Sequence, residues 1–226
     1  MRITLTRYGM PQIIVIPMIS LGLGILGWMF WPEARPWLQV ILLVDMLAIL
    51  AFFRDPDRKI PVEPDILLAP ADGKITDIVE VEEPEYLQGP AIRIGIFLSV
   101  FDVHINRAPC SGTVAYIQEH PGKCVNALNS EAASEENQAT CLGMLCSDHP
   151  AGKVKVKQIT GAIARRIVCK VRVGEKLAAG QRYGMIKFGS RTELYLPCDN
   201  RVEVLVKKGD SVRAGTTIMV RYTHRV

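Results

Sequence analysis

Val173-Gly174-Glu175-Lys176-Leu177-Ala178-Ala179-Gly180 is echoed thirty-five residues later by Lys208-Gly209-Asp210-Ser211-Val212-Arg213-Ala214-Gly215. In both stretches two glycines stand six residues apart, with an acidic residue after the first glycine and an apolar residue before the second. Glycine adopts backbone conformations that other residues avoid, so each phrase predicts a tight turn that leads back into a strand. The repeat therefore indicates a β-rich architecture.

The repeated phrase is typical of the β-hammerhead turns in biotinyl/lipoyl-type barrels. Swinging-arm carriers of that type bear a modified lysine, but neither a Met-Lys-Met nor an Asp-Lys-Ala tripeptide accompanies the repeat in this chain. We therefore expect a barrel-sandwich domain of the biotinyl/lipoyl-like kind that does not serve as a carrier.

Short stretches rich in β-branched residues lie on the N-terminal side of the repeat, separated by Gly, Pro and Asp. They cover residues 74–79, 92–97, 113–117 and 154–159. Several of them alternate apolar with polar side chains, which is the pattern of a half-buried strand. A polar segment at 129–138 predicts a loop or a short helix. Residues 59–226 are expected to form one mostly β domain.

The first part of the chain is strongly apolar. Residues 12–31 carry no charge, and residues 37–53 contain only Gln39 and Asp45 as polar side chains. Twenty helical residues span roughly 30 Å, about one hydrocarbon core. Because the short phrase Pro32-Glu33-Ala34-Arg35-Pro36 separates the two runs, the sequence predicts a tight helical hairpin. We expect residues 1–58 to anchor the chain in a membrane.

Tryptophans and charges predict the orientation of the hairpin. All three tryptophans of the chain flank the turn, and such rings collect at membrane interfaces. Arg2 and Arg7 precede the first run, and Arg54, Arg58 and Lys59 follow the second. By the positive-inside rule both ends of the hairpin face the cytoplasm. The predicted location is the inner cell membrane, with the β domain on its cytoplasmic face.

The apolar runs also allow arrangements other than a spanning hairpin. A cleaved signal peptide is disfavoured, because the first run is longer than such a segment, lacks a small-x-small cleavage site and is followed by a second run. Asp45 would be costly inside a bilayer, so a re-entrant or interfacial hairpin stays open beside a full crossing.

The composition fits this division. The length of 226 residues excludes a large multidomain machine. The formal net charge is +4. Its mean hydropathy of +0.17 is high for a chain with 22% charged residues, and the apolar hairpin accounts for the excess. The six cysteines form no Cys-x-x-Cys pair, which predicts reduced thiols. Cys141, Cys146 and His149 match no zinc pattern, so we expect no metal. No nucleic-acid partner is expected.

The segment between the two repeats carries the chemistry. It reads Lys187-Phe188-Gly189-Ser190-Arg191-Thr192-Glu193-Leu194-Tyr195-Leu196-Pro197, and it resembles the processing site of the short-form phosphatidylserine decarboxylases. Further phrases that resemble this family are Phe52-Phe53-Arg54-Asp55-Pro56 with Ile60-Pro61, Ala69-Pro70-Ala71-Asp72-Gly73, Phe101-Asp102-Val103-His104-Ile105-Asn106-Arg107-Ala108-Pro109, and Gln158-Ile159-Thr160-Gly161-Ala162-Ile163-Ala164-Arg165-Arg166-Ile167. These phrases in the right order are far more specific than a lone Gly-Ser pair.

The resemblance implies an enzyme that makes its own cofactor. The Ser190 hydroxyl attacks the Gly189 carbonyl, and elimination from the resulting ester leaves a β chain, 1–189, and an α chain, 190–226, that begins with a pyruvoyl group. Glycine before the serine leaves room for this attack. The pyruvoyl carbonyl forms a Schiff base with phosphatidylserine and accepts the electrons released with CO2, which yields phosphatidylethanolamine. No metal or dissociable cofactor is implied.

The resemblance also implies residues that assist. His104 is expected to act as a general base for Ser190, as a proton donor after decarboxylation, or as both. Asp72 resembles the family aspartate that orients or charges a base, although Asp-Gly between apolar runs also predicts a hairpin turn. Longer bacterial members carry a second histidine three positions after the first, where this chain has Arg107. An alternative is that Arg107 and Asp102 share the work with His104.

Binding of an anionic headgroup requires cations. Arg107, Arg165 and Arg166 are candidates, because guanidinium groups match phosphate geometry. The expected partners are phosphatidylserine in the membrane and the two fragments of one precursor, and the family allows a homodimer. An archaetidylserine-type ether lipid is an alternative substrate, and a non-catalytic, membrane-tethered β-barrel adaptor is an alternative function. The Gly189-Ser190 pair, together with the His104 and Asp72 phrases, favours the enzyme.

Overall fold

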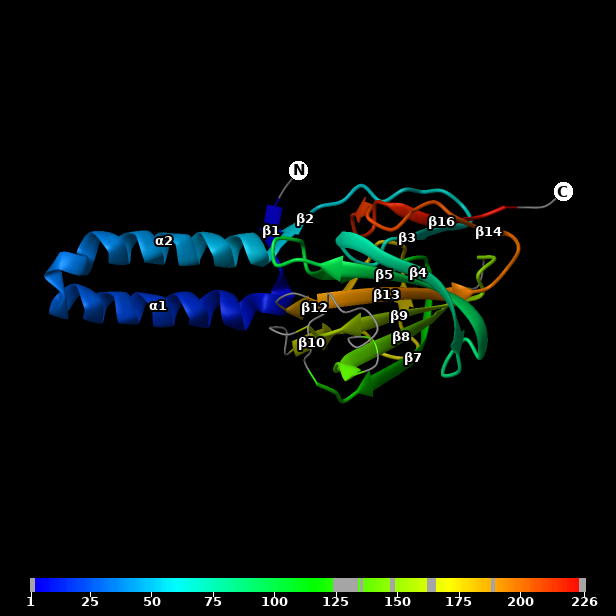
Figure 1. Ribbon diagram of the computed structural model, residues 1–226, viewed down its shortest axis with the longest axis horizontal. Helices are drawn as coiled ribbons and strands as arrows, with labels where there is room; N and C mark the ends of the chain where they lie inside the picture. The colour runs from blue at the N-terminus through cyan, green and yellow to red at the C-terminus, as the bar shows by residue number, and fades with distance from the viewer. Residues whose placement is uncertain are drawn as a thin grey trace. The chain divides into compact units, whose positions relative to one another are not determined.

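The computed structural model describes residues 3–123, 134, 136–146, 149–161, 166–187 and 190–223. The chain forms two compact units, Met1–Asp57 and Arg58–Val226. Helices dominate the first unit and strands the second (Figure 1).

The first unit is a helical hairpin closed by a pair of short strands. Its elements are β1 (Ile3–Leu5), the 3-10 turn η1 (Arg7–Gly9), α1 (Met10–Phe30), the 3-10 turn η2 (Pro32–Ala34), α2 (Arg35–Phe52) and β2 (Arg54–Pro56). The segments Arg7–Phe30 and Pro32–Phe52 are long and apolar enough to cross a membrane. The two apolar runs are therefore confirmed as helices, each of which begins two residues earlier than the run that predicted it.

Glycines and one polar pair hold the two helices together. A Cβ on Gly24 would lie 2.7 Å from a methyl group of Leu42, and one on Gly27 would lie 2.9 Å from a methyl group of Leu38, so both glycines allow close approach. The Ser20 hydroxyl donates a hydrogen bond of 2.7 Å to the Asp45 carboxylate. The costly carboxylate in the second run therefore has a partner on the first helix.

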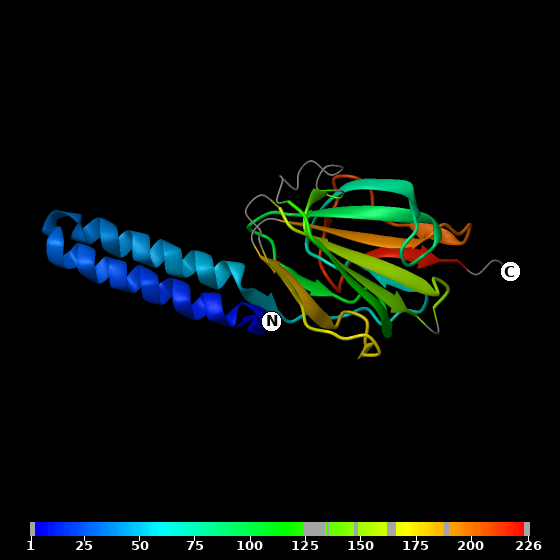
Figure 2. The same cartoon turned by 90° about the horizontal axis from the view of Figure 1, so that it is seen from below.

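The second unit is built on an antiparallel sheet of eight strands that curls into a half-barrel (Figure 2). In spatial order the strands are β11 (Lys176–Leu177), β7 (Gly112–His120), β8 (Ala139–Leu145), β9 (Lys153–Ile159), β13 (Ser190–Pro197), β5 (Gly89–Leu98), β4 (Gly73–Glu83) and β15 (Ser211–Val212). The four predicted strands are confirmed within β4, β5, β7 and β9. Most of the polar segment predicted at 129–138 lies outside the described residues.

Two smaller sheets complete the second unit. One has the order β10 (Arg166–Cys169), β12 (Arg182–Lys187) and β6 (Ile105–Arg107), and the other has β14 (Val202–Val204), β16 (Ile218–Tyr222) and β3 (Ile66–Leu68). Side chains from all three sheets meet in one apolar core, with Leu194 and Leu196 of β13 among its members. Because side chains alternate along a strand, Ser190 and Thr192 of β13 lie on this core face of the sheet, whereas Arg191 and Glu193 lie on the opposite face.

The two repeated phrases form equivalent turns at opposite edges of the eight-stranded sheet. In the first turn Lys176 pairs with Thr113 of β7, and in the second Ser211 pairs with Lys74 of β4. The leading glycines have φ angles of 90° and 98°, and the closing glycines have 72° and 70°, a region that favours glycine. The predicted turns that lead back into strands are confirmed.

The strands that receive these turns begin with a second repeat, which was missed in the sequence. Ala69-Pro70-Ala71-Asp72-Gly73 precedes β4, and Ala108-Pro109-Cys110-Ser111-Gly112 precedes β7. The backbone N–H of each closing repeat glycine donates to the first alanine of one of these phrases, from Gly215 to Ala69 and from Gly180 to Ala108. The second unit thus contains two similar strand and turn arrangements.

The cysteines differ in part from the prediction of reduced thiols. Cys110 and Cys146 form a disulfide, so for this pair the prediction is wrong. Their partnership joins two segments that lie 36 residues apart, which the sequence spacing did not reveal. Among the described residues Cys141, Cys169 and Cys198 are free thiols.

Candidate active site

Ser190 is the first residue of β13 and lies opposite Leu98, the last residue of β5. The residue is fully buried, and its hydroxyl oxygen has no hydrogen-bond partner among the described residues. A buried hydroxyl without a partner costs free energy, so such a group in a folded protein calls for an explanation. Gly189, the other half of the predicted cleavage site, lies outside the described residues.

His104 is also fully buried and directly precedes β6. Its backbone carbonyl accepts a hydrogen bond of 3.2 Å from the N–H of Ile186. Ile186 lies near the end of β12, four residues before Ser190, so His104 lies beside this end of β12. Nδ1 of the imidazole lies 2.9 Å from the carbonyl oxygen of Asp102. Because a carbonyl only accepts, Nδ1 carries the proton, and the lone pair of the neutral ring is on Nε2.

The loop that carries His104 starts at the strand partner of Ser190. After Leu98 the chain turns back on itself, with the Asp102 N–H donating to the Ser99 carbonyl at 3.0 Å and the Ser99 N–H donating to the Asp102 carboxylate at 2.8 Å. These two bonds fix the carbonyl of Asp102 that holds the imidazole. The sequence thereby brings Ser190 and His104 to the same end of the sheet from different strands.

Asp72 lies in the turn before β4 and is mostly buried. One carboxylate oxygen accepts a hydrogen bond of 2.8 Å from the N–H of Ala214, and the other pairs with the Arg58 guanidinium at 2.7 Å. Burial raises the pKa of this carboxyl above its ordinary value, Arg58 opposes that rise, and the charge of Asp102 adds to it.

The three arginines predicted to bind substrate have different surroundings. Arg107 is buried and donates a hydrogen bond of 3.0 Å to the carbonyl of Gly180 in the first repeat turn. Arg166 is exposed on β10, directly opposite Lys187. Burial lowers the pKa of the Lys187 ammonium, and the charge of Arg166 lowers it further. Arg165 lies outside the described residues.

Three polar side chains on the core face were not among the predicted site residues. Thr192 follows Ser190 on this face of β13, and its hydroxyl accepts a hydrogen bond of 3.1 Å from the Asn106 amide of β6. Gln158 stands opposite Thr192 on β9 and donates at 2.8 Å to the Asn106 carboxamide oxygen. All three residues are fully buried. The signal was present, because each lies within or beside a phrase that resembles the family.

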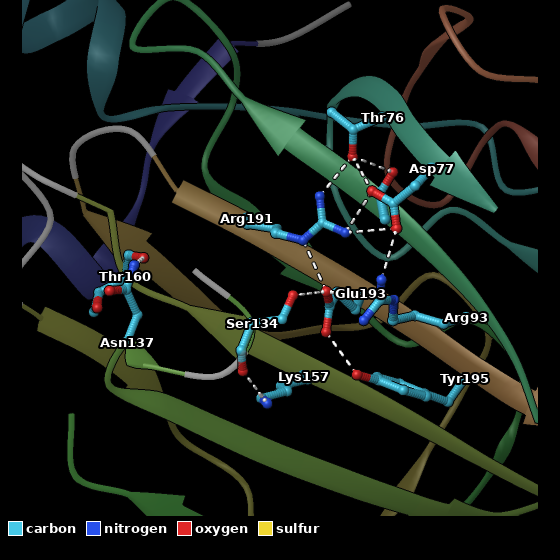
Figure 3. A network of polar contacts seen from close by, with 11 residues as sticks. Thr76, Asp77, Arg93, Ser134, Asn137, Lys157, Thr160, Arg191, Glu193 and Tyr195 are labelled. Carbon is cyan, nitrogen blue, oxygen red and sulfur yellow. Dashed lines mark hydrogen bonds and ion pairs between the residues drawn. The ribbon is translucent and has the colours of Figure 1, made fainter. Parts of the chain in front are cut away.

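A charged network covers the opposite face of the same strands (Figure 3). The fully buried Arg191 pairs with the Asp77 carboxylate at 2.7 Å and with Glu193 at 2.8 Å. The hydroxyls of Ser134 and Tyr195 also donate to Glu193. Burial alone would raise the pKa of Glu193, but Arg191 and these hydrogen bonds outweigh it, so the net pKa lies below its ordinary value. This network fixes the side chain of Arg191, the residue that follows Ser190 on β13.

Possible metal ligands do not gather around Ser190 among the described residues. Glu85, His120 and Cys141 come together elsewhere, where the Lys155 ammonium already lies 2.9 Å from the Glu85 carboxylate. His149 uses both ring nitrogens, since Nε2 donates to the carbonyl of Ile66 and Nδ1 accepts from the N–H of Ala151. His149 therefore has a structural role in binding two backbone segments.

Taken with the fold, these positions define a β domain with a buried serine at the start of a strand and a buried histidine at the same end of the sheet. A family model described as phosphatidylserine decarboxylase matches residues 47–220. The chain is 44% identical to the phosphatidylserine decarboxylase proenzyme of Rhodopirellula baltica over 96% of this chain and 87% of that protein. It is 48% identical to the proenzyme of Carboxydothermus hydrogenoformans over 82% and 84% of the two chains. The chain belongs to the phosphatidylserine decarboxylase family.

Proposed function

We propose that this chain is a self-processing, pyruvoyl-dependent phosphatidylserine decarboxylase that releases CO2 and phosphatidylethanolamine. The observation that carries the proposal is the buried Ser190 hydroxyl without a hydrogen-bond partner among the described residues, at the end of the sheet where His104 lies. A buried hydroxyl to which no described residue is hydrogen-bonded is poised to react with the peptide bond that precedes it. The name proenzyme, which the relatives carry, supports a cut in the chain.

The self-cleavage step uses only groups of the chain itself. Ser190 Oγ transfers its proton to a base, for which His104 Nε2 is the proposed acceptor, and forms a bond to the Gly189 carbonyl carbon. The bond from that carbon to the Ser190 nitrogen breaks as the nitrogen takes the proton back from the base, which leaves an ester and a free amino group. Loss of the Ser190 α-proton and of the ester oxygen then frees residues 1–189 as a carboxylate. The dehydroalanine that remains at position 190 takes up water and releases ammonia, which yields the pyruvoyl group.

The Ser190 oxygen also supports the fit of a pyruvoyl group at this position. That atom leaves with the large fragment, and no hydrogen bond to a described residue is lost with it. When present, the group supplies a reactive carbonyl and an electron sink for decarboxylation. The side chains of Thr192, Asn106 and Gln158 would border it on the core face. His104, whose proton on Nδ1 is held by the Asp102 carbonyl, is placed to return a proton to the product from Nε2.

The finer fold assignment is also a proposal. Two equivalent turns that close opposite edges of the curled sheet support a barrel-sandwich of the biotinyl/lipoyl-like kind for residues 59–226. Residues 1–58 would then be the membrane anchor. Arg166 is the described, exposed candidate for contact with the phosphate of the substrate.

The membrane location is supported by features of both units. Two helices are long and apolar enough to cross a bilayer. The cations that flank them support a β domain on the cytoplasmic face of the inner membrane, by the positive-inside rule. In the second unit, the loop before His104 carries Phe101, which is 83% exposed, and Val100, which is 42% exposed. Exposed apolar side chains next to a lipid-processing site suit contact with the acyl boundary of a bilayer.

The proposal is tested on the purified chain in detergent with phosphatidylserine. A denaturing gel and intact mass should show fragments 1–189 and 190–226, and the small fragment should begin with a pyruvoyl group. Release of CO2 should follow the amount of cleaved protein. A chain that stays at full length through prolonged incubation and releases no CO2 would instead favour the membrane-tethered adaptor.

A further inference from the structure

We propose that Gln158 binds the amino group of the substrate, with its carboxamide oxygen accepting an N–H as the amine approaches the carbonyl made from Ser190. The inference rests on the proposed function and adds a recognition residue to it. Gln158 is fully buried on the core face of β9, and its Oε1 has no hydrogen-bond partner among the described residues. Gln158 and Ser190 thus each present, on the same face of adjacent strands, a buried oxygen that is hydrogen-bonded to no described residue.

A chain of hydrogen bonds fixes the orientation of the Gln158 carboxamide. The Asn106 amide nitrogen faces the carbonyl of Pro70 at 3.5 Å and donates to the Thr192 hydroxyl at 3.1 Å. Since the Pro70 carbonyl only accepts, the Asn106 carboxamide must turn its own oxygen toward Gln158. The Nε2 of Gln158 donates a hydrogen bond of 2.8 Å to the Asn106 oxygen, so the Oε1 of Gln158 is directed away from Asn106.

The register of the sheet brings Oε1 within reach of position 190. Gln158 lies directly opposite Thr192, and Ser190 is the next residue of β13 on the same face. Diagonal neighbours of this kind in an antiparallel pair are about 7–8 Å apart, a span that a long side chain covers together with a small bound group. An amine that attacks the carbonyl at position 190 would therefore pass beside Gln158 Oε1.

The chemistry of a carboxamide suits this task. The serine headgroup brings an amine, a carboxylate and a phosphodiester, and only the amine can donate to an acceptor. A carboxylate at position 158 would stabilise the ammonium form, which has no lone pair for attack. A neutral carboxamide oxygen binds an N–H without that penalty, and it repels the anionic groups less. Gln158 would therefore select the reactive end of the headgroup and direct it inward.

The test uses full-length Gln158→Leu, which removes the acceptor, and Gln158→Asn, which keeps a carboxamide but withdraws it by one methylene. Thr140→Val is the matched control, because Thr140 lies opposite Gln158 on the same face of β8, on the side away from β13. Three quantities are measured: the yield of fragments, the reaction of the small fragment with hydroxylamine, and its reductive trapping with phosphatidylserine and cyanoborohydride, followed by mass. Hydroxylamine reports the carbonyl itself, and trapping reports delivery of the lipid amine.

We expect both Gln158 variants to be cleaved and to react with hydroxylamine, while the rate of trapping and kcat/KM fall by about ten- to hundredfold. Thr140→Val should match the wild type in all three. Trapping by either cleaved variant at the wild-type rate would overturn the proposal. Loss of fragments in both variants would also overturn it, since Gln158 would then serve processing. If the wild-type chain gave neither fragments nor trapping, the proposed function itself would fail.

Discussion

Asp72 and Ser111 occupy equivalent positions in two copies of the same turn. Each is the fourth residue of an Ala-Pro-x-x-Gly phrase, and each accepts a hydrogen bond from a backbone N–H of the turn that pairs with it. Ala214 donates to Asp72 at 2.8 Å, and Ala179 donates to Ser111 at 3.0 Å. A hydroxyl is therefore sufficient to hold this turn. Compared with the Ser111 hydroxyl, the Asp72 carboxylate has a second oxygen, which pairs with Arg58.

This equivalence separates the structural role of Asp72 from a chemical one. We expect Asp72→Ser to fold, because the new hydroxyl can cap Ala214 as Ser111 caps Ala179. Loss of the contact with Arg58 should lower the free energy of unfolding by about 1–3 kcal/mol. Cleavage should slow by about a hundredfold if the carboxylate charges the base. Fragment yield against time on a gel and denaturant unfolding in detergent measure the two effects.

Ser111→Ala is the matched control for Asp72, since it removes the equivalent turn cap, which is a hydroxyl instead of a carboxylate. It should lose about 1 kcal/mol of stability and still be cleaved at the wild-type rate. If Asp72→Ser were cleaved as fast as the wild type, Asp72 would be a turn cap and nothing more.

Ser190→Ala should abolish cleavage and CO2 release together, because alanine has no oxygen that could attack the preceding carbonyl. The protein should remain a single chain of 226 residues by intact mass. The fold should survive, since the lost hydroxyl has no hydrogen-bond partner among the described residues. Release of CO2 by this variant would show that the electron sink does not derive from position 190.

His104→Asn tests the assignment of the imidazole. The asparagine amide can still donate to the Asp102 carbonyl in place of Nδ1, but no group remains at the position of Nε2. The protein should therefore fold and lose about 10²- to 10⁴-fold in the rate of the step that needs the base. Cleavage and CO2 release are measured separately, which also decides whether His104 serves one step or both. Unchanged rates of both cleavage and CO2 release would indicate that His104 has only a structural role in the core.

The buried network around Glu193 predicts how stability depends on pH. The pKa values of Glu193 and Asp77 lie below their ordinary values, because ion pairs and hydrogen bonds outweigh burial. The same holds for Glu83, which pairs with Lys155 outside this network. The folded state then binds fewer protons than the unfolded state. Their stabilisation is present above the ordinary carboxyl values of 3.8 to 4.5 and is lost as pH falls through the lower folded values.

Glu193→Gln should consequently cost about 3–5 kcal/mol at neutral pH, since it leaves the buried Arg191 with one carboxylate fewer. The difference from the wild type should shrink as the pH falls below the ordinary value of 4.5. Unfolding in denaturant at several pH values measures it, with the exposed Glu119→Gln as control. A difference that grew toward acid pH would contradict the pairing.

Phe101→Ser should weaken turnover of phosphatidylserine in vesicles while cleavage proceeds normally. In the proposed membrane contact, loss of the exposed phenyl ring forfeits about 1.5–3 kcal/mol of burial in the bilayer, which should raise the apparent KM. A short-chain, monomeric substrate should be turned over at the wild-type rate. Val173→Ser is the control, because Val173 is 63% exposed in a repeat turn at the sheet edge. Equal losses with both substrates would argue for a role of Phe101 inside the site.

Much of the fold could be predicted because it rests on local patterns. Two uncharged runs predicted the helices, alternation predicted four central strands, and glycine spacing predicted both edge turns. The pairing of Ser20 with Asp45 and the bond between Cys110 and Cys146 could not be predicted, because each depends on which segments the fold brings together.

The polar face of β13 shows a second limit of sequence patterns. Arg191 and Glu193 alternate with Thr192 and Leu194, a pattern that usually places the charged residues in solvent. Both are fully buried, because they neutralise each other and Asp77 from a neighbouring segment. The hydrogen bond between Asn106 and Gln158 could not be predicted either, since it joins residues that lie 52 positions apart. The site residues that were predicted, by contrast, came from contiguous phrases.

The strand that begins at Ser190 runs between β9 and β5 in the interior of the eight-stranded sheet. A cut before this residue would therefore create a new chain end inside the folded core without freeing either piece. The small fragment would contribute the central strand β13, the edge strand β15, and β14 and β16 of a second sheet. The mature protein would be an interleaved two-chain complex, and its fragments would not exchange between molecules without global unfolding. The proposed cut would thus be tolerated, because strand pairing already makes covalent continuity at that point unnecessary.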